Sequence, residues 1–206
     1  MAITTYTELQ ASVADWLNRS DLTSVIPDFI ALAEAEFNTR LRHWRGETSG
    51  SLALSSQFTA LPNDFLEVSR LTLSDAAPRR MELMSTSEMQ ELRERNDDTG
   101  GAPIYYAITA GQVEVYPSPD QAYTAALVYH AAPDALSGSN ADNWVLLNFP
   151  SLYLFGACYH GSLYLQDEQR TTYFGGLFEK SLAEVIRDGE RGKYGGAGLR
   201  MKVGAY

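Results

Sequence analysis

The chain has 206 residues, of which 45% are hydrophobic and 11% are aromatic, so it is long and apolar enough to fold around a substantial core. The chain has 16 Lys and Arg and 26 Asp and Glu, which gives a formal net charge of −10. This acidic balance argues against general nucleic-acid binding, because such binding uses basic side chains to neutralise phosphates. A single cysteine, Cys158, excludes an internal disulfide framework, and the first residues lack the basic and apolar regions of a secretory signal.

Two helices are expected at the N-terminus. Thr5 and Glu8 have the spacing of a capping box, which predicts a helix over 5–18. A second helix, over 25–44, has Pro27 in its first turn, and the two are expected to form a helical hairpin. Apolar residues recur at helical intervals in both, and the predicted buried faces comprise Tyr6, Leu9, Val13, Trp16, Leu17, Phe29, Ile30, Ala33, Phe37 and Leu41.

After Arg45 the hydrophobic period changes to one that is typical of β-strands. The expected elements are strands over 47–55 and 65–74, a short helix over 85–95, a hairpin about Ala110-Gly111 and a strand near 122–131. The strand near 122–131 is expected to complete an antiparallel meander with the hairpin.

The C-terminal third returns to helical spacing. Residues 143–166 contain no charged side chain and are long enough for a membrane span, but Pro150 divides the segment and no basic residue anchors it. A buried helix over 150–165 is therefore favoured. Because this helix is apolar on nearly every side, it needs partners on every side, and contacts with other subunits are expected to supply those that the chain itself does not.

A last helix is expected over 168–189, with a kink at Gly175-Gly176. Its predicted buried side comprises Tyr173, Phe174, Leu177, Leu182, Val185 and Ile186.

Together these elements predict an α+β fold. The N- and C-terminal helix pairs, in residues 1–45 and 140–190, are expected to form one helical bundle. Residues 46–139 are expected to form an inserted, mainly antiparallel β lobe, and residues 191–206 an extended C-terminal arm.

No catalytic, cofactor-binding or metal-binding site is predicted. The histidines His43, His130 and His160 lack the spacing of metal ligands. Cys158 and His160 stand two residues apart on a helix, which turns them to opposite sides, so a core cysteine is favoured over a thiol dyad. Asp97-Asp98 lacks further oxygen ligands at EF-hand spacing, so a solvated turn is favoured over a cation site. We therefore expect a protein that is not an enzyme and needs no cofactor.

The last segment, RGKYGGAGLRMKVGAY from 191 to 206, carries four basic side chains and no acid. Residues 1–190 therefore hold 12 Lys and Arg against 26 acids, a net of −14. After the glycines, three apolar residues alternate with two cationic ones, which is the spacing of a strand with one apolar and one cationic side. Such an arm can add to another subunit's sheet edge or lie in its groove, and the alternative is a frayed end. The residues expected to bind a partner are Arg191, Lys193, Tyr194, Leu199, Arg200, Met201, Lys202 and Val203.

Five short motifs resemble those of head-to-tail adaptor proteins of tailed bacteriophages. They are Thr5–Leu9, Ile26–Ile30, Leu61–Glu67, Ala102–Tyr106 and Tyr194–Gly196, so the resemblance extends over nearly the full chain. The motifs are helix caps, turns and core positions, and none of them is a catalytic signature.

The resemblance implies a virion structural protein that forms a ring, commonly of twelve copies, below the portal and above the tail components, which are nozzle or tail-completion proteins. In such proteins a helical bundle surrounds the DNA channel and an extended C-terminal segment reaches the portal. The arm residues would then contact the portal or a neighbouring subunit, and DNA would pass through without specific binding. The protein would be located at the head–tail junction of the virion after assembly in the host cytoplasm, with no membrane involved.

Two other function classes stay open. A tail-completion protein or another tail structural protein would differ in not binding the portal. A small hydrolase with an unrecognised site is the more distant alternative, and the lack of a nucleophile–base pair in the sequence speaks against it.

Overall fold

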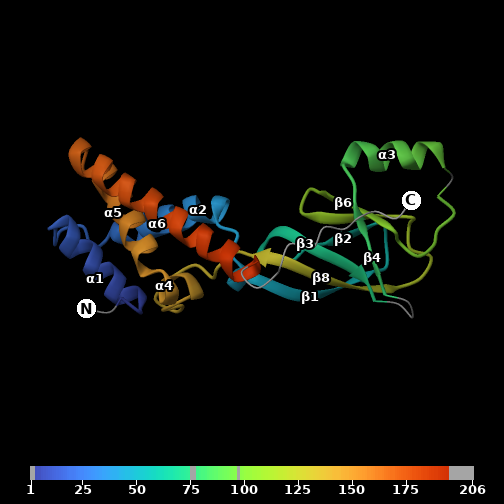
Figure 1. The fold of residues 1–206 in the computed structure, drawn as a ribbon, viewed down its shortest axis with the longest axis horizontal. Coiled ribbons are helices and arrows are strands. Elements are labelled where there is room, and N and C mark those ends of the chain that lie inside the picture. Colours follow the sequence, from blue (N-terminus) through green and yellow to red (C-terminus); the bar gives the residue numbers. More distant parts are fainter. Residues whose placement is uncertain (1–2, 75–77, 97, 195–206) are drawn as a thin grey trace. The chain divides into compact units, whose positions relative to one another are not determined.

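The computed structural model describes residues 3–74, 78–96 and 98–194 (Figure 1). The chain divides into two compact units, one formed by residues up to 46 together with those from 133 onwards, and one formed by residues 47–132. We call them the helical unit and the β unit. Six α-helices and two mostly antiparallel sheets make up the described residues, which confirms the expected α+β class.

The helical unit contains five of the α-helices. They are α1 (Tyr6–Leu17), α2 (Ile26–Arg40), α4 (Trp144–Asn148), α5 (Pro150–Tyr164) and α6 (Glu168–Tyr194), with a 3₁₀ turn, η1 (Trp44–Gly46), after α2. The capping box predicted for α1 is confirmed, because Glu8 N donates to Thr5 Oγ1 over 3.3 Å while Thr5 N donates to Glu8 Oε2 over 3.0 Å. α2 ends at Arg40, earlier than predicted, since the backbone of Leu41 is extended.

α5 is the central helix of this unit and packs against α1, α2, α4 and α6. Two glycines permit the close approach of these neighbours. A Cβ at Gly156 would lie 2.8 Å from the Cβ of Ala33 in α2, and one at Gly161 would lie 2.6 Å from Cδ1 of Leu17. Helices of the same chain therefore cover most of α5, and its large exposed apolar side chains, Leu163 and Tyr164, stand at its C-terminal end.

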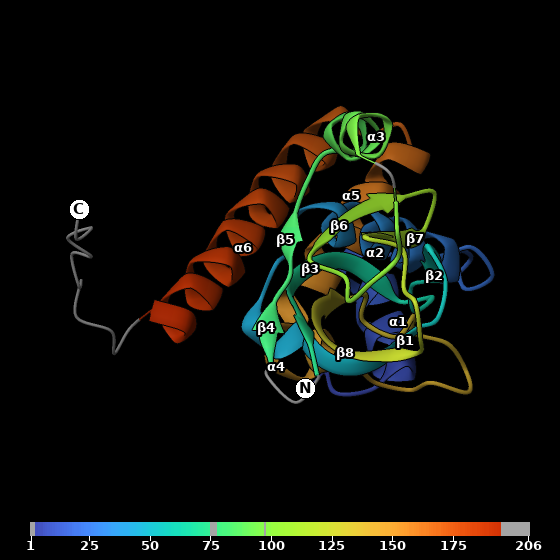
Figure 2. The ribbon, with the colours of Figure 1, turned by 90° about the vertical axis from the view of Figure 1, so that its right-hand side faces the viewer.

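The β unit contains two four-stranded sheets. Sheet A has the order β1-β8-β3-β4 and sheet B the order β2-β7-β6-β5, and β5 pairs with β6 in the parallel sense. The strands are β1 (Glu47–Leu54), β2 (Phe58–Ala60), β3 (Phe65–Leu73), β4 (Arg79–Arg80), β5 (Glu82–Leu83), β6 (Tyr105–Thr109), β7 (Gln112–Tyr116) and β8 (Tyr123–Ala131). The short segment that carries β4 and β5 therefore belongs to both sheets (Figure 2).

The hairpin predicted about Ala110-Gly111 is confirmed between β6 and β7, with positive φ values of 49° and 76° at its two central residues. The predicted meander is wrong. β8 does not pair with this hairpin but lies between β1 and β3 in sheet A, where its alternate residues, Tyr123, Ala125, Leu127 and Tyr129, are buried. The remaining helix, α3 (Thr86–Arg95), packs on β6 through buried Met89 and has the expected Ser85–Glu88 capping box.

Candidate interaction surfaces

The end of α6 carries the first of the predicted partner-binding residues. The helix continues to Tyr194, so Arg191, Lys193 and Tyr194 belong to it and not to an extended arm. Gly189 does not end the helix, because it is buried against His43 and a Cβ there would lie 2.9 Å from the imidazole Cδ2. Arg191 and Lys193 are exposed in the last turn, where the helix dipole favours positive charge. The other predicted residues, Leu199, Arg200, Met201, Lys202 and Val203, lie outside the described residues.

His43 stands at the centre of a buried aromatic cluster in the helical unit. Arg45 N donates to its Nδ1 over 3.1 Å, so Nε2 carries the proton and donates to Oδ2 of Asp188 over 3.3 Å. Burial lowers the pKa of His43, and the nearby carboxylate offsets this only in part. The cluster fixes η1 against α4 and α6, which is a packing role. The ring neighbours, with centroids 5.3 to 5.5 Å away, are Trp44, Trp144 and Phe149.

A second buried polar group joins α2, α5 and the segment before α4. Oε1 of Glu34 accepts hydrogen bonds from the hydroxyl of Tyr153 over 2.8 Å and from Leu136 N over 2.9 Å. Nδ2 of Asn143 donates to the Tyr153 hydroxyl over 2.6 Å. Burial raises the pKa of Glu34 and of Tyr153. Each of these buried groups forms a hydrogen bond with another, so the network attaches residues 133–143 to the helical core.

The remaining candidates for chemistry are also held in structural contacts. Asp98 accepts hydrogen bonds from Ser118 N over 3.0 Å and from Arg93 Nη1 over 2.6 Å. Burial raises the pKa of Asp98, but the hydrogen bonds from Ser118 and Gly100 and the charge of Arg93 outweigh it and lower the pKa. Burial raises the pKa of the Cys158 thiol to about 12, so it stays protonated and unreactive at neutral pH.

Within residues 3–74, 78–96 and 98–194, no group of three or more His, Cys, Asp or Glu side chains is arranged to hold a metal ion. In the same part of the chain, no helix combines the length and the apolar character needed to cross a bilayer.

An exposed aromatic surface runs over three helices of the helical unit. Trp16 in α1 is 47% exposed, and its ring centroid lies 5.7 Å from that of Phe155 in α5 and 6.2 Å from that of Phe174 in α6. Tyr173, which contacts Phe174 at 5.3 Å, is 61% exposed. Exposed apolar surface of this kind marks interaction sites. We call exposed Trp16 and Tyr173, together with partly buried Phe155 and buried Phe174 beneath them, the aromatic surface.

Helical spacing predicts that Trp16 and Tyr173 are buried, and this prediction is wrong for both residues. One signal was available for Tyr173. Tyr173 lies about 100° round the helix from Phe174, which is buried, so it stands at the margin of the buried face, where a hydroxyl-bearing ring is often left partly in water.

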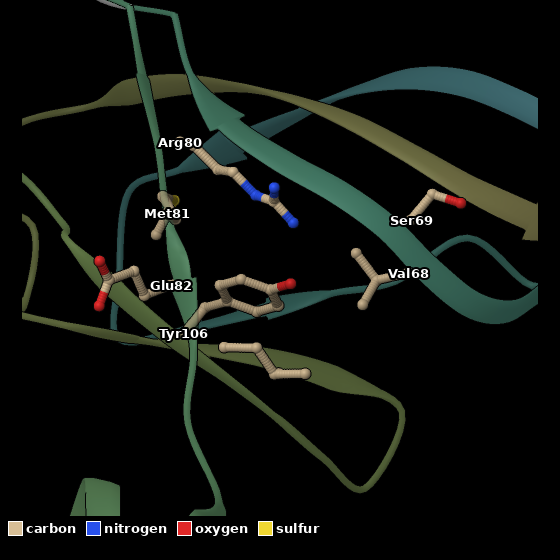
Figure 3. Close-up of a pocket in the computed structure, with 7 residues that line it drawn as sticks. Val68, Ser69, Arg80, Met81, Glu82 and Tyr106 are labelled. Carbon is tan, nitrogen blue, oxygen red and sulfur yellow. The ribbon is translucent and has the colours of Figure 1, made fainter. Parts of the chain in front are cut away.

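A pocket of about 420 Å³ lies in the β unit, beside the segment that links the two sheets (Figure 3). The side chains of Val68, Arg80 and Tyr106 converge on it from β3, β4 and β6. Tyr106 is buried, and this burial raises its pKa although the charge of Arg80 acts the other way. The lining mixes apolar side chains with polar and charged ones, and comprises Val68, Ser69, Arg80, Met81, Glu82, Leu83 and Tyr106.

Comparison with known proteins gives one clear relationship. A family model described as SU10 adaptor protein matches residues 4–201 of the chain. This match confirms the resemblance to phage head-to-tail adaptors that the sequence motifs indicated. A comparison with curated proteins finds no significant match.

Proposed function

Because the chain belongs to the SU10 adaptor protein family, we propose that this phage adaptor is a virion structural protein that joins the portal to the tail. Copies of it form a ring, of twelve by analogy with other head-to-tail adaptors, and the ring continues the DNA channel. The proposed site of action is the head–tail junction, with assembly in the host cytoplasm. On the tail side the partners are nozzle or tail-completion proteins.

The proposal of a ring rests on the aromatic surface of the helical unit. Large aromatic side chains supply much of the binding energy in protein interfaces, and they are costly to leave in water. Trp16 and Tyr173 are about half exposed although both lie beside buried core residues. A neighbouring copy that covers these two side chains would bury apolar surface that α1 and α6 leave exposed.

The C-terminal residues are the proposed contact to the portal or to the next copy. Arg191 and Lys193 present positive charge at the end of α6, and the sequence after Tyr194 adds two more cations. Residues 1–190 carry a net charge of −14, so an acidic surface on a neighbouring copy would attract this segment.

A role without enzymatic turnover agrees with the chemistry of the described residues. His43, Glu34 and Asp98 are held in packing or hydrogen-bond networks, and the Cys158 thiol has a raised pKa. The small hydrolase alternative therefore has no observation in its favour. A tail-completion or other tail structural protein remains the second candidate, since the adaptor family relationship and the aromatic surface suit either assembly role.

The test is assembly with purified portal, followed by native mass spectrometry. We expect a complex of portal with a ring of adaptor copies, and we expect deletion of residues 195–206 to leave the protein folded but to weaken the complex. Free protein that is monomeric agrees with the proposal, because the portal can template the ring. Persistent failure of the intact chain to bind the portal, with binding to a tail protein instead, would favour the tail-completion alternative.

A further inference from the structure

The pocket of the β unit contains a buried tyrosine whose hydroxyl has no partner. Tyr106 belongs to the core cluster of this unit and is only 5% exposed. Within residues 3–74, 78–96 and 98–194 its hydroxyl forms no hydrogen bond, and the side chain points into the pocket (Figure 3). The hydroxyl of a buried tyrosine usually has a hydrogen-bond partner. A ligand that placed an acceptor atom in the pocket would supply the missing one.

A second donor faces the same space. Arg80 of β4 lines the pocket, and its guanidinium extends toward the ring of Tyr106 (Figure 3). Burial raises the pKa of Tyr106 and the charge of Arg80 opposes this rise, so the two groups are close enough to interact. In the described part of the chain the guanidinium forms no ion pair and no hydrogen bond. The pocket therefore offers two donors, one of them cationic, to an acceptor with negative charge.

The other walls of the pocket are largely apolar. Val68 of β3 lines it, and so do Met81 and Leu83, of which Leu83 is 59% exposed. The volume of about 420 Å³ exceeds what a carboxylate group alone would fill, and it lies within the range of cavities that hold small ligands. A ligand that fills the pocket therefore needs an apolar body beside its charged group.

Two irregularities of the strands shape this pocket. β3 changes its register against β8 at Ser69, which is an extra residue in the pairing. The Ser69 hydroxyl donates to Oε1 of Glu47 over 2.8 Å, so the bulge is held in place. Opposite it, the chain passes from sheet A to sheet B at Met81, between β4 and β5. Bulges often lie beside binding sites because they redirect side chains, and here one forms part of the wall.

One acidic residue also lines the pocket, but its charge is directed elsewhere. The carboxylate of Glu82 points away from the space between Arg80 and Val68 (Figure 3). The pairing of β5 with β6 agrees, since Glu82 lies opposite Tyr105 and the next residue lies opposite Tyr106. Arg80 thus supplies a single positive charge, which balances one carboxylate better than it balances a phosphate dianion.

We propose that this pocket binds a carboxylate that is carried on an apolar body. The carboxylate oxygens accept hydrogen bonds from Arg80 and Tyr106, and the body packs against Val68, Met81 and Leu83. This site goes beyond the adaptor role and does not depend on it. Two sources share the chemistry, a free organic acid and a glutamate side chain of another polypeptide, whose carboxylate stands on two methylene groups.

The test is a methyl NMR titration of the full chain with hexanoate, because Val68, Met81 and Leu83 each carry a methyl reporter in the pocket lining. We expect saturable shifts of these methyl signals with a Kd of about 1 mM. Hexanol has the chain without the charge, and inorganic phosphate has charge without the chain, so each should bind at least about tenfold more weakly. Absence of saturable shifts, or equal binding of hexanol or phosphate, would overturn the proposal.

Two substitutions then assign the donors. Arg80→Gln should weaken hexanoate binding about tenfold and Tyr106→Phe about fivefold, since each removes one hydrogen bond to the carboxylate. The matched controls are Arg79→Gln and Tyr105→Phe. Arg79 donates to the carbonyl of Ala102 over 3.1 Å, and Tyr105 packs in the cluster beneath α3, so neither lines the pocket. Unchanged affinity in both pocket variants, or an equal loss in the controls, would contradict the assignment.

The methyl spectra also report whether each variant folds. Arg80 is exposed, so Arg80→Gln decides the matter even if Tyr106→Phe is destabilised. A further arm compares N-acetyl-glutamate amide with N-acetyl-glutamine amide. Tighter binding of the glutamate derivative than of hexanoate supports a polypeptide side chain as the natural occupant, and the opposite order supports a free acid. Equal binding of the glutamine and glutamate derivatives would overturn the requirement for a carboxylate.

Discussion

The hydroxyl of Tyr153 in α5 donates a hydrogen bond of 2.8 Å to Oε1 of Glu34 in α2. The same oxygen accepts the N–H of Leu136, so one carboxyl group ties two helices to the segment that re-enters the helical unit. Burial raises the pKa of Glu34 above its ordinary value of 4.5, although both hydrogen bonds lower it. Folding therefore favours the protonated form of this group.

The first prediction concerns the pH dependence of this contact. Between the ordinary pKa of 4.5 and the raised pKa of Glu34, the folded state binds more protons than the unfolded state, so the free energy of unfolding should fall as pH rises. Glu34→Gln removes this titration and keeps an acceptor oxygen. Urea unfolding at a series of pH values should show a difference from the parent chain that changes in this window. The exposed Glu184→Gln is the control, and a constant difference for Glu34→Gln would contradict the prediction.

Two helical glycines should respond in opposite ways to alanine. Gly156→Ala would place a Cβ 2.8 Å from Ala33 and 3.0 Å from Phe178, so we expect it to destabilise the helical unit by about 1–3 kcal/mol. At Gly176 nothing lies within 4 Å of the added carbon, and Gly176→Ala should stabilise α6 by up to about 1 kcal/mol through helix propensity. Thermal unfolding of both variants decides the matter. Shifts of the same sign would show that close packing at Gly156 is not the cause.

The His43 cluster gives a prediction for acidic conditions. The pKa of His43 is lowered from 6.5 by burial, so the unfolded state binds this proton more tightly and stability is lost as pH falls below 6.5. The carboxylate of Asp188 raises the pKa and limits the loss. We therefore expect Asp188→Asn to match the parent chain above this pH and to be less stable below it. Denaturant midpoints across the range provide the measurement, with exposed Glu190→Gln as control.

Truncation of the aromatic surface should impair assembly more than folding. Trp16→Ala removes a side chain that is already 47% exposed, and we expect portal-templated assembly to weaken by about 2 kcal/mol, roughly 30-fold. Leu32→Ala is the matched control, because Leu32 is 51% exposed on α2. Sedimentation of portal complexes over a concentration series measures both. Equal effects of the two substitutions would remove the basis for the aromatic surface as a subunit contact.

The charge of the chain leads to a prediction about DNA. With a net of −14 over residues 1–190, a channel wall made by this protein should repel phosphates and not retain them. We expect no tight binding to duplex DNA at physiological salt in a gel-shift titration. Tight binding with a steep salt dependence would show that phosphate contacts exist and would contradict an acidic channel surface.

Local features of the fold could be predicted from the sequence. The capping boxes at Thr5 and Ser85 and the turn at Ala110-Gly111 are each formed by residues within a few positions of one another. The same holds for the helix that begins at Pro150, whose apolar composition is itself the signal. Such elements depend on short-range hydrogen bonds and hydrophobic period, which a sequence displays directly.

Features set by distant contacts could not be predicted. Gly189 has the sequence character of a helix end, yet its missing side chain makes room for His43, which lies far earlier in the chain. β8 has the alternation of any half-buried strand, and nothing in it specifies β1 and β3 as neighbours. The pocket likewise depends on β3 and β5 meeting at the ends of two sheets, so none of its residues was identified from the sequence.

The pairing of Glu47 with His130 has a consequence for how this chain can be altered. These residues face each other across β1 and β8, at the points where the chain enters and leaves the β unit. Opposed residues in antiparallel strands have Cα atoms only about 5 Å apart. A short turn from Gly46 to Pro133 could therefore close the gap if residues 47–132 were excised. The β unit is thus an insertion whose two ends lie on neighbouring strands, so its removal would leave the order of the flanking helices unchanged.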